Sequence, residues 1–175
     1  MSLPRRPRSL FATSANVYLM LALTLLMTAL HITWLPLLTA PPDLMLVLIV
    51  AWSLLRGLEE GLLWAFAGGV LLDLLSGGPF GAFTLALLLA ALLAGAVHRA
   101  AFSATLLQVA VMALATFIYH IAYALVLATA VRPAWGFVSS LIGPALAWNV
   151  VLLFLGYRPL VWVTRRAGGG VMRMP

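Results

Sequence analysis

Charged residues are scarce in this sequence. Only 8% of its 175 residues are Asp, Glu, Lys or Arg, whereas 65% are hydrophobic and the mean hydropathy is +1.14. Soluble domains have about 25% charged residues, so this chain has too few to cover a surface in contact with water. The composition excludes an ordinary soluble domain and predicts a protein that lies in a lipid bilayer.

Cysteine and lysine are both absent. Without cysteine the chain has no disulfide, no thiolate metal ligand and no cysteine nucleophile. Its ten basic residues are all arginines, and they give a net charge of +6. Because these arginines are spread along the chain and not gathered in one stripe, the positive charge does not predict nucleic-acid binding.

Acidic residues and histidines are also rare, with four and three in the chain. His31, His98 and His120 fall in different segments, and the first two are expected at opposite faces of the bilayer, so the three cannot form one metal site. The sequence has no paired nucleophile and base, no phosphate-binding loop and no series of carboxylates for proton pumping. We therefore expect no catalytic residue, no metal, no cofactor and no enzymatic activity.

Long hydrophobic segments fill the chain and are separated by short stretches with Gly, Pro or Arg. A chain of this length has room for about six membrane spans of roughly 20 residues and for no further soluble domain. We expect one all-α transmembrane domain over residues 1–166, followed by a flexible tail over residues 167–175. The expected spans are residues 10–35, 44–55, 61–75, 80–97, 102–131 and 135–155, and residues 157–166 are expected to form a separate interfacial segment.

The arginines predict the orientation of these spans. Six spans place both termini on one side of the membrane, and Arg132 is then the one arginine of the ten that falls on the opposite side. Positively charged residues flank membrane spans mainly on the cytoplasmic side. We therefore expect a multi-pass membrane protein with both termini in the cytoplasm.

Two neighbouring spans carry small residues at every fourth position. The first of these faces consists of Gly57, Gly61, Ala65 and Gly69 followed by Asp73, and the second of Ala82, Ala86, Ala90 and Ala94. Residues four apart share one face of a helix, and small residues let two membrane helices approach closely. A short turn with Gly78 and Gly81 joins the two spans, which are expected to pack as a tight antiparallel pair.

Asp73 is an isolated carboxylate in an apolar segment. It lies about 18 Å along the helix from Gly61, which places it near the outer face of the bilayer. Pairing with Arg132, or capping of the backbone amides of residues 76–78, would give it a structural role, which we favour. Binding of a partner protein and transport chemistry remain the alternatives, because an ionisable group inside a span is often functional.

Polar side chains gather in the last two spans. The fifth span has Gln108, Thr116, Tyr119, His120 and Tyr123, and the sixth has Ser139, Ser140 and Asn149. Such groups can line a pocket for a small molecule, but in membrane proteins they more often form hydrogen bonds between helices. We therefore favour a helix interface over a ligand pocket.

Part of the chain follows a recognisable pattern. A Pro-Asp pair opens one span, and a glycine-rich span follows that ends in G-x-x-x-D-L-L and leads into a glycine turn. The residues of this pattern are Pro42, Asp43, Leu44, Gly61, Phe66, Gly69, Asp73, Leu74, Leu75, Gly78 and Gly81. Over about residues 41–98 the chain resembles the rod shape-determining protein MreD family.

This resemblance implies a non-enzymatic scaffold in the inner membrane that helps to organise peptidoglycan synthesis and rod shape. Members of that family associate with the bitopic protein MreC, and through it with the filament protein MreB and with the peptidoglycan glycosyltransferase and transpeptidase of the elongation complex. The family's bundle is similar to the substrate-binding subunits of energy-coupling-factor transporters, so a vitamin-binding transport subunit is the alternative function. A homodimer is also left open.

The resemblance and the small-residue faces together select the candidate site. Its residues are expected either to pack the helices of the bundle or to receive the single helix of a partner protein. They are Pro42, Asp43, Gly61, Ala65, Gly69, Asp73, Gly78 and Gly81, with Arg132 as the candidate ion-pair partner of Asp73.

Overall fold

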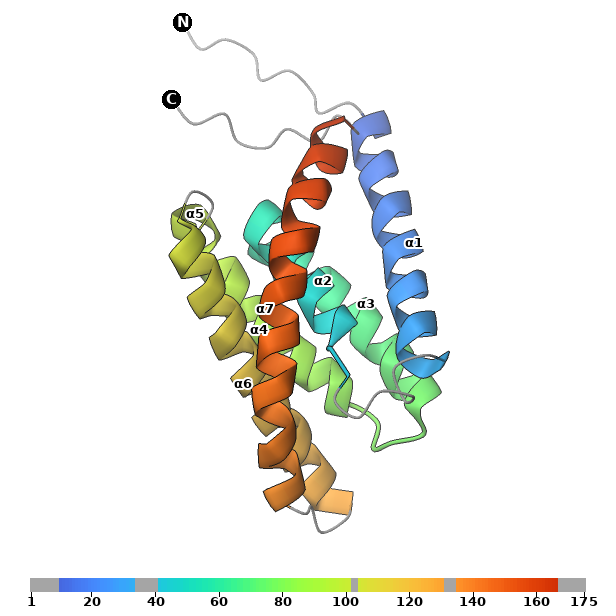
Figure 1. Ribbon diagram of the computed structural model, residues 1–175. Helices are drawn as coiled ribbons and strands as arrows, with labels where there is room; N and C mark the ends of the chain where they lie inside the picture. Colours follow the sequence, from blue (N-terminus) through green and yellow to red (C-terminus); the bar gives the residue numbers. More distant parts are fainter. Residues whose placement is uncertain (1–9, 34–40, 102–103, 131–134, 167–175) are drawn as a thin grey trace, which may run out of the picture.

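The computed structural model describes residues 10–33, 41–101, 104–130 and 135–166. Over these residues the chain forms helices and short connections without any strand, which confirms the predicted all-α class (Figure 1). The helices are α1 (Leu10–Thr33), α2 (Leu44–Arg56), α3 (Leu58–Ser76), α4 (Ala82–Ala96), α5 (His98–Ala101), α6 (Thr105–Ala130) and α7 (Trp135–Arg166).

Helix α2 lies at the centre of the bundle. Every residue from Met45 to Leu55 is buried, and α2 contacts each of the other described helices. A helix that is apolar on all sides, as this one is, is typically enclosed by other helices. The core of the protein is therefore built around α2.

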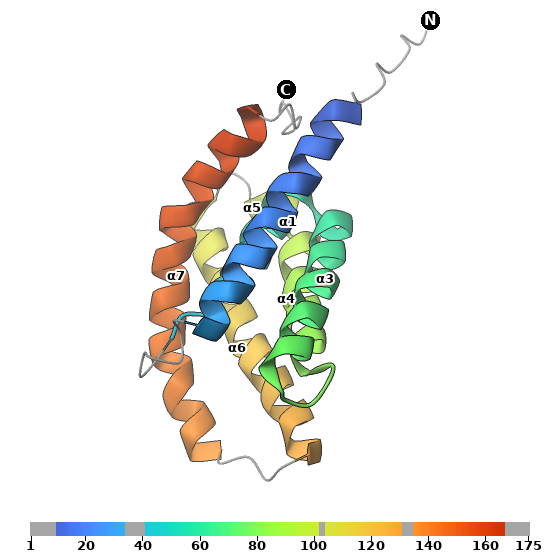
Figure 2. The same ribbon diagram turned by 90° about the vertical axis from the view of Figure 1, so that its right-hand side faces the viewer.

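Two pairs of helices and α1 pack around α2. Helices α6 and α7 lie side by side in both views, and α3 and α4 form an antiparallel pair (Figures 1 and 2). Helix α1 packs against α2 and α3. The sequence correctly predicted the close pairing of α3 with α4, but it gave no indication that α2 would be the central helix.

A single residue, Gly57, joins α2 to α3. Its φ of 90° lies in the left-handed region that favours glycine, and a Cβ added there would lie 3.4 Å from His98 Nε2. Because the joint is so short, α3 begins at Leu58, before its predicted start at Gly61. The same contact brings the end of α2, the start of α3 and the start of α5 together at one end of the molecule.

Helix α7 is longer than predicted. The sequence suggested a span that ends near Leu155 and a separate segment over residues 157–166, but one helix continues to Arg166 with Pro159 inside it. Proline is tolerated in membrane helices because neighbouring groups can satisfy the carbonyl that it leaves free. The predicted tail, residues 167–175, lies outside the described part of the chain.

The surface of the bundle is strongly apolar. Among the described residues, two helical segments are long and apolar enough to cross a membrane, Thr105–Thr129 and Ile142–Thr164. Large hydrophobic side chains are exposed on α1, α3, α4, α6 and α7, and Leu106 on α6 is 87% exposed. Contiguous exposed apolar surface of this extent indicates contact with lipid or with partner proteins, in agreement with the composition.

Candidate functional site

Asp73 caps the N-terminus of α4 from the neighbouring helix α3. Its Oδ1 accepts a hydrogen bond from the backbone N–H of Phe83 (2.9 Å), and its Oδ2 accepts one from the backbone N–H of Thr84 (3.1 Å). The hydroxyl of Thr84 also donates to Oδ2 (2.5 Å). The first N–H groups of a helix have no partner within the helix, and this end favours negative charge. Asp73 therefore satisfies donors that burial would otherwise leave unpaired.

This geometry differs in detail from the prediction. Capping of the amides of residues 76–78 was considered, but the carboxylate reaches past them to the first turn of α4. Gly77 and Gly81, with φ values of 68° and 96°, reverse the chain so that the start of α4 faces Asp73. Arg132, the other candidate partner, lies outside the described residues, so its pairing with Asp73 stays a prediction.

The small residues of α3 and α4 face the interior of the bundle. Gly61, Ala65 and Gly69 are buried. A Cβ added at Gly69 would overlap the backbone of Thr84 on α4, and one added at Gly61 would overlap the Ser53 side chain on α2. In this arrangement the small residues pack helices of the same chain together, and a partner helix has no access to them.

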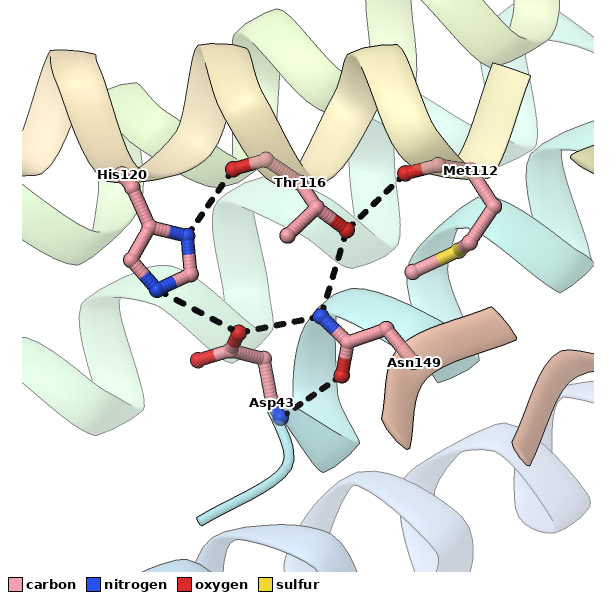
Figure 3. A network of polar contacts seen from close by, with 5 residues as sticks. All are labelled: Asp43, Met112, Thr116, His120 and Asn149. Carbon is pink, nitrogen blue, oxygen red and sulfur yellow. Dashed lines mark hydrogen bonds and ion pairs between the residues drawn. The ribbon is translucent and has the colours of Figure 1, made fainter. Parts of the chain in front are cut away.

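A second carboxylate, Asp43, lies in a polar network between three helices (Figure 3). Asp43 directly precedes α2, and its backbone N–H donates to Asn149 Oδ1 on α7 (2.9 Å), while Asn149 Nδ2 donates to Asp43 Oδ2 (3.0 Å). Asn149 Nδ2 also donates to Thr116 Oγ1 on α6 (3.2 Å). The Thr116 hydroxyl donates in turn to the carbonyl oxygen of Met112 (2.9 Å). These bonds fasten the start of α2 to both α6 and α7.

The side chain of Asn149 satisfies its partners in one orientation only. Its oxygen faces a backbone N–H, and its NH₂ group faces a carboxylate and a hydroxyl oxygen. Turning the amide by half a rotation would place the NH₂ group against the N–H of Asp43 and would break all three bonds. Because Asn149 is completely buried, these contacts fix its position without competition from solvent.

His120 on α6 completes the network. Its Nδ1 lies 2.9 Å from the carbonyl oxygen of Thr116, and since a carbonyl can only accept, Nδ1 carries the hydrogen. Its Nε2 therefore faces Asp43 Oδ2, at 3.7 Å (Figure 3). This contact is an ion pair when Nε2 is protonated, and it is longer than an ordinary hydrogen bond. The edge of the His120 ring also contacts the buried Tyr119 ring, with 5.3 Å between the ring centroids.

The network lies at mid-depth of the long helices. Thr116 lies about 17 Å from the first residue of α6 and about 21 Å from the last, at 1.5 Å per residue. Asp43 is thus far from both ends of α6. An ionisable group at such a depth inside the bundle is by default a candidate functional residue. The irregular chain before α2 contains Pro41 and Pro42, which lack N–H groups, so the Asp43 amide is the donor that needs a partner at this depth.

The predicted polar residues of α6 and α7 do not all lie in one place. Thr116, His120 and Asn149 form the interface that we favoured, and its hydrogen bonds connect α6 with α7. Gln108 is one turn inside the start of α6 and lines a separate small pocket. Ser140 is exposed, and the side chain of Ser139 lies outside the described set.

Sequence reasoning missed the central role of Asp43. It was treated as part of a helix-opening motif between two spans and was not connected with the polar residues of the last two spans. One signal was available, because the helix that follows Pro42-Asp43 is apolar on every side. A helix without a polar face is enclosed by others, which places its first residue inside the bundle as well.

No group of three or more His, Cys, Asp or Glu residues that could hold a metal ion occurs in the described ranges. His98 and His120 lie on different helices, and the side chain of His31 is not among those described. Asp43 and His120 form a pair of titratable groups, but both also bond to atoms within the bundle. The geometry thus supports a role in holding helices together.

The fold and this site define a class, that of all-helical membrane proteins whose polar groups connect helices inside the bundle. The family follows from comparison with known proteins. The chain matches the family model for rod shape-determining protein MreD over residues 8–164 and belongs to this family. The match confirms the resemblance seen in the sequence and extends it over nearly the whole chain.

The same comparisons found no curated protein and no solved structure that matches the chain. The similarity of the bundle to the substrate-binding subunits of energy-coupling-factor transporters therefore stays a prediction. Family membership makes the chain a rod shape-determining protein of the bacterial membrane.

Proposed function

We propose that this protein is a non-enzymatic scaffold subunit of the complex that elongates the bacterial cell wall. Membership of the MreD family over residues 8–164 is the observation that carries the proposal. The scaffold binds a bitopic protein of the MreC type and, through it, an MreB-like filament and the peptidoglycan glycosyltransferase and transpeptidase. Its contribution is to position these proteins during synthesis, and it performs no chemistry itself.

The polar groups bond to other helices of the same bundle, and this supports a scaffold function. Asp73 is bonded to the start of α4, and Asp43 is bonded to α7. The faces with Gly61 and Gly69 pack against α2 and α4. Because these groups serve the bundle, a partner must bind the outer surface, and the network around Asp43 keeps that surface in one shape.

Six membrane spans with both termini in the cytoplasm complete the proposal. The contact between Gly57 and His98 supports it, because it brings the ends of α2 and α4 to the same end of the molecule. Arg56 and Arg99 are adjacent to this contact in the sequence, so they also lie at this end. A concentration of arginines at one end of a bundle is typical of the cytoplasmic side.

Single cysteines test this topology directly, because the chain has none of its own. We expect a membrane-impermeant maleimide to label Ser76→Cys, the last residue of α3 beside the turn to α4, when it is applied from outside to spheroplasts. Ala100→Cys, on α5, should be labelled only after the membrane is opened. Both positions are exposed. The opposite result, or labelling of both positions from outside, would contradict the proposed orientation.

The scaffold function is tested by purifying the tagged protein from native membranes in mild detergent. The proteins that co-purify with it are then identified by mass spectrometry. We expect a bitopic MreC-like protein and cell-wall synthases, which should be absent when an unrelated multi-pass protein carries the same tag. Recovery of paired ATPases with a coupling membrane subunit would instead identify a transporter subunit.

A matched pair of variants connects the buried network to this function. Asp43→Asn removes the charge that faces His120 at 3.7 Å, whereas Glu59→Gln makes the same chemical change at an exposed position. We expect Asp43→Asn to reduce both the recovery of the partner and the rod shape of complemented cells, and Glu59→Gln to change neither. Equal behaviour of the two variants would show that the Asp43 charge is not needed for assembly.

A further inference from the structure

Helices α6 and α7 enclose a small pocket near the first turn of α6. Its polar lining consists of Thr105 and Gln108 on α6 and of Tyr157 and Arg158 on α7, and Leu153 and Phe154 form its apolar side. Its volume is about 60 Å³. One water molecule needs roughly 10–15 Å³ of such space, so the pocket has room for a group about the size of phosphate.

The polar lining is rich in hydrogen-bond donors and contains no carboxylate. Arg158 has a fixed positive charge with five N–H groups, and its planar geometry suits phosphate oxygens. Thr105 and Gln108 add a hydroxyl and an amide. A lining with a fixed positive charge and no acidic side chain favours an anion over a cation.

The start of α6 adds to the positive potential around the pocket. Thr105 is its first residue, and the first turn of this 26-residue helix has no acidic side chain. The unpaired N–H groups of a helix N-terminus attract anions and are a frequent phosphate site. The helix N-terminus thus adds to the attraction that the side-chain donors exert on an anion, and the proposal does not depend on it.

We propose that the pocket between α6 and α7 binds a phosphate group, either from the headgroup of an anionic phospholipid or from a soluble phosphate. Its surroundings suit a lipid, because Phe154 and Leu155 on α7 and Leu106 on α6 expose apolar surface that acyl chains can cover. A basic pocket between membrane helices on the cytoplasmic side is a common headgroup site. This site is separate from the Asp43 network and does not depend on the scaffold proposal.

The test uses the full-length protein and two probes, phosphatidylglycerol in phosphatidylcholine nanodiscs and inorganic phosphate. Bound phosphatidylglycerol is counted by native mass spectrometry, and inorganic phosphate is assayed by the shift that it causes in the melting temperature. The informative variants are Arg158→Gln and Thr105→Val, the second of which removes only a hydroxyl from the pocket lining. Arg99→Gln is the control, because Arg99 is an exposed arginine on α5 that does not line the pocket.

We expect Arg158→Gln to weaken phosphatidylglycerol binding about tenfold or more, as loss of a charge-assisted hydrogen bond does, and Arg99→Gln to leave it unchanged. A melting shift with inorganic phosphate that is lost in Arg158→Gln would identify a soluble phosphate as the ligand. Equal weakening by Arg158→Gln and Arg99→Gln would overturn the proposal in favour of general surface charge, and so would the absence of binding to both probes. If Arg158→Gln does not fold, Thr105→Val decides, because unchanged binding in that variant refutes the pocket as the phosphate site.

Discussion

Replacement of Asn149 by leucine is the most direct perturbation of the buried network. Leucine has the same branched shape as asparagine, a larger volume and no polar group, so Asn149→Leu removes all three hydrogen bonds of the amide without opening a cavity. The backbone N–H of Asp43 and its carboxylate oxygen Oδ2 then each lose their bond to the amide, although Oδ2 still faces His120 Nε2 at 3.7 Å. Thr116 is less affected, because its hydroxyl keeps its bond to the carbonyl of Met112.

The structure allows the size of this effect to be bounded. Hydrogen bonds between membrane helices contribute on average about 0.6 kcal/mol each, so three of them give about 2 kcal/mol as a lower bound. If both groups of Asp43 stayed unsatisfied, the cost would be about 1–3 kcal/mol for each, or up to about 6 kcal/mol as an upper bound, which the remaining His120 contact of Oδ2 lowers. The lower half of this range is the better expectation, because the unfolded helices in a membrane also find hydrogen-bond partners. We therefore expect a loss of about 2–4 kcal/mol.

Thermal unfolding in mild detergent measures this loss through the intrinsic fluorescence of the six tryptophans, of which Trp52 is fully buried. For a chain of this size a loss of 2–4 kcal/mol lowers the melting temperature by roughly 4–16 °C. Trp148→Leu is the matched control, because it places leucine at the preceding, exposed position of the same helix. A melting temperature for Asn149→Leu within about 2 °C of the control would refute the view that the network stabilises the bundle.

Two further changes test the packing of α3 against α4 by the same melting measurement. Gly69→Leu must force α4 away, because even a Cβ at this position overlaps the backbone of Thr84, and we expect a loss of about 1–3 kcal/mol or more. Gly143→Ala, where a Cβ meets open space, should cause no loss, and equal melting of the two glycine variants would contradict the close approach. Asp73→Ala leaves the first amides of α4 uncapped and should cost about 0.5–2 kcal/mol, whereas Asp73→Asn should retain part of the cap. Stability unchanged in Asp73→Ala would mean that other groups satisfy these amides.

Most of the helices could be predicted because membrane composition leaves few alternatives. Long apolar segments must form helices, since backbone groups cannot remain unpaired in lipid, and glycine and proline mark the turns between them. The boundaries were less reliable where a single residue decides them. Gly57 joins two helices with no intervening loop, and Pro159 lies within α7 instead of ending it.

The candidate site was harder to predict, because its contacts join distant parts of the chain. Asp73 lies 10 residues from Phe83, so a local cap was foreseeable in kind, although the amides that it caps were not the expected ones. Asp43 and Asn149 are 106 residues apart, and no spacing rule connects them. Hydrophobic periodicity shows which face of a helix is buried, but it does not show which buried polar groups will meet.

The central position of α2 has a consequence for how the protein is made. A helix of 13 residues is about 20 Å long, shorter than a hydrocarbon layer of about 30 Å, so the second span needs residues beyond α2 itself to reach across. During synthesis this segment emerges before α4, α6 and α7, which later cover it, and 106 residues before the amide that satisfies Asp43. Until α7 arrives, α2 lacks part of its packing and the Asp43 carboxylate lacks the Asn149 amide. The α2 segment is therefore the part of the nascent chain that most needs the insertion machinery to hold it, and variants that leave the finished bundle stable but delay α7 should be degraded during biogenesis.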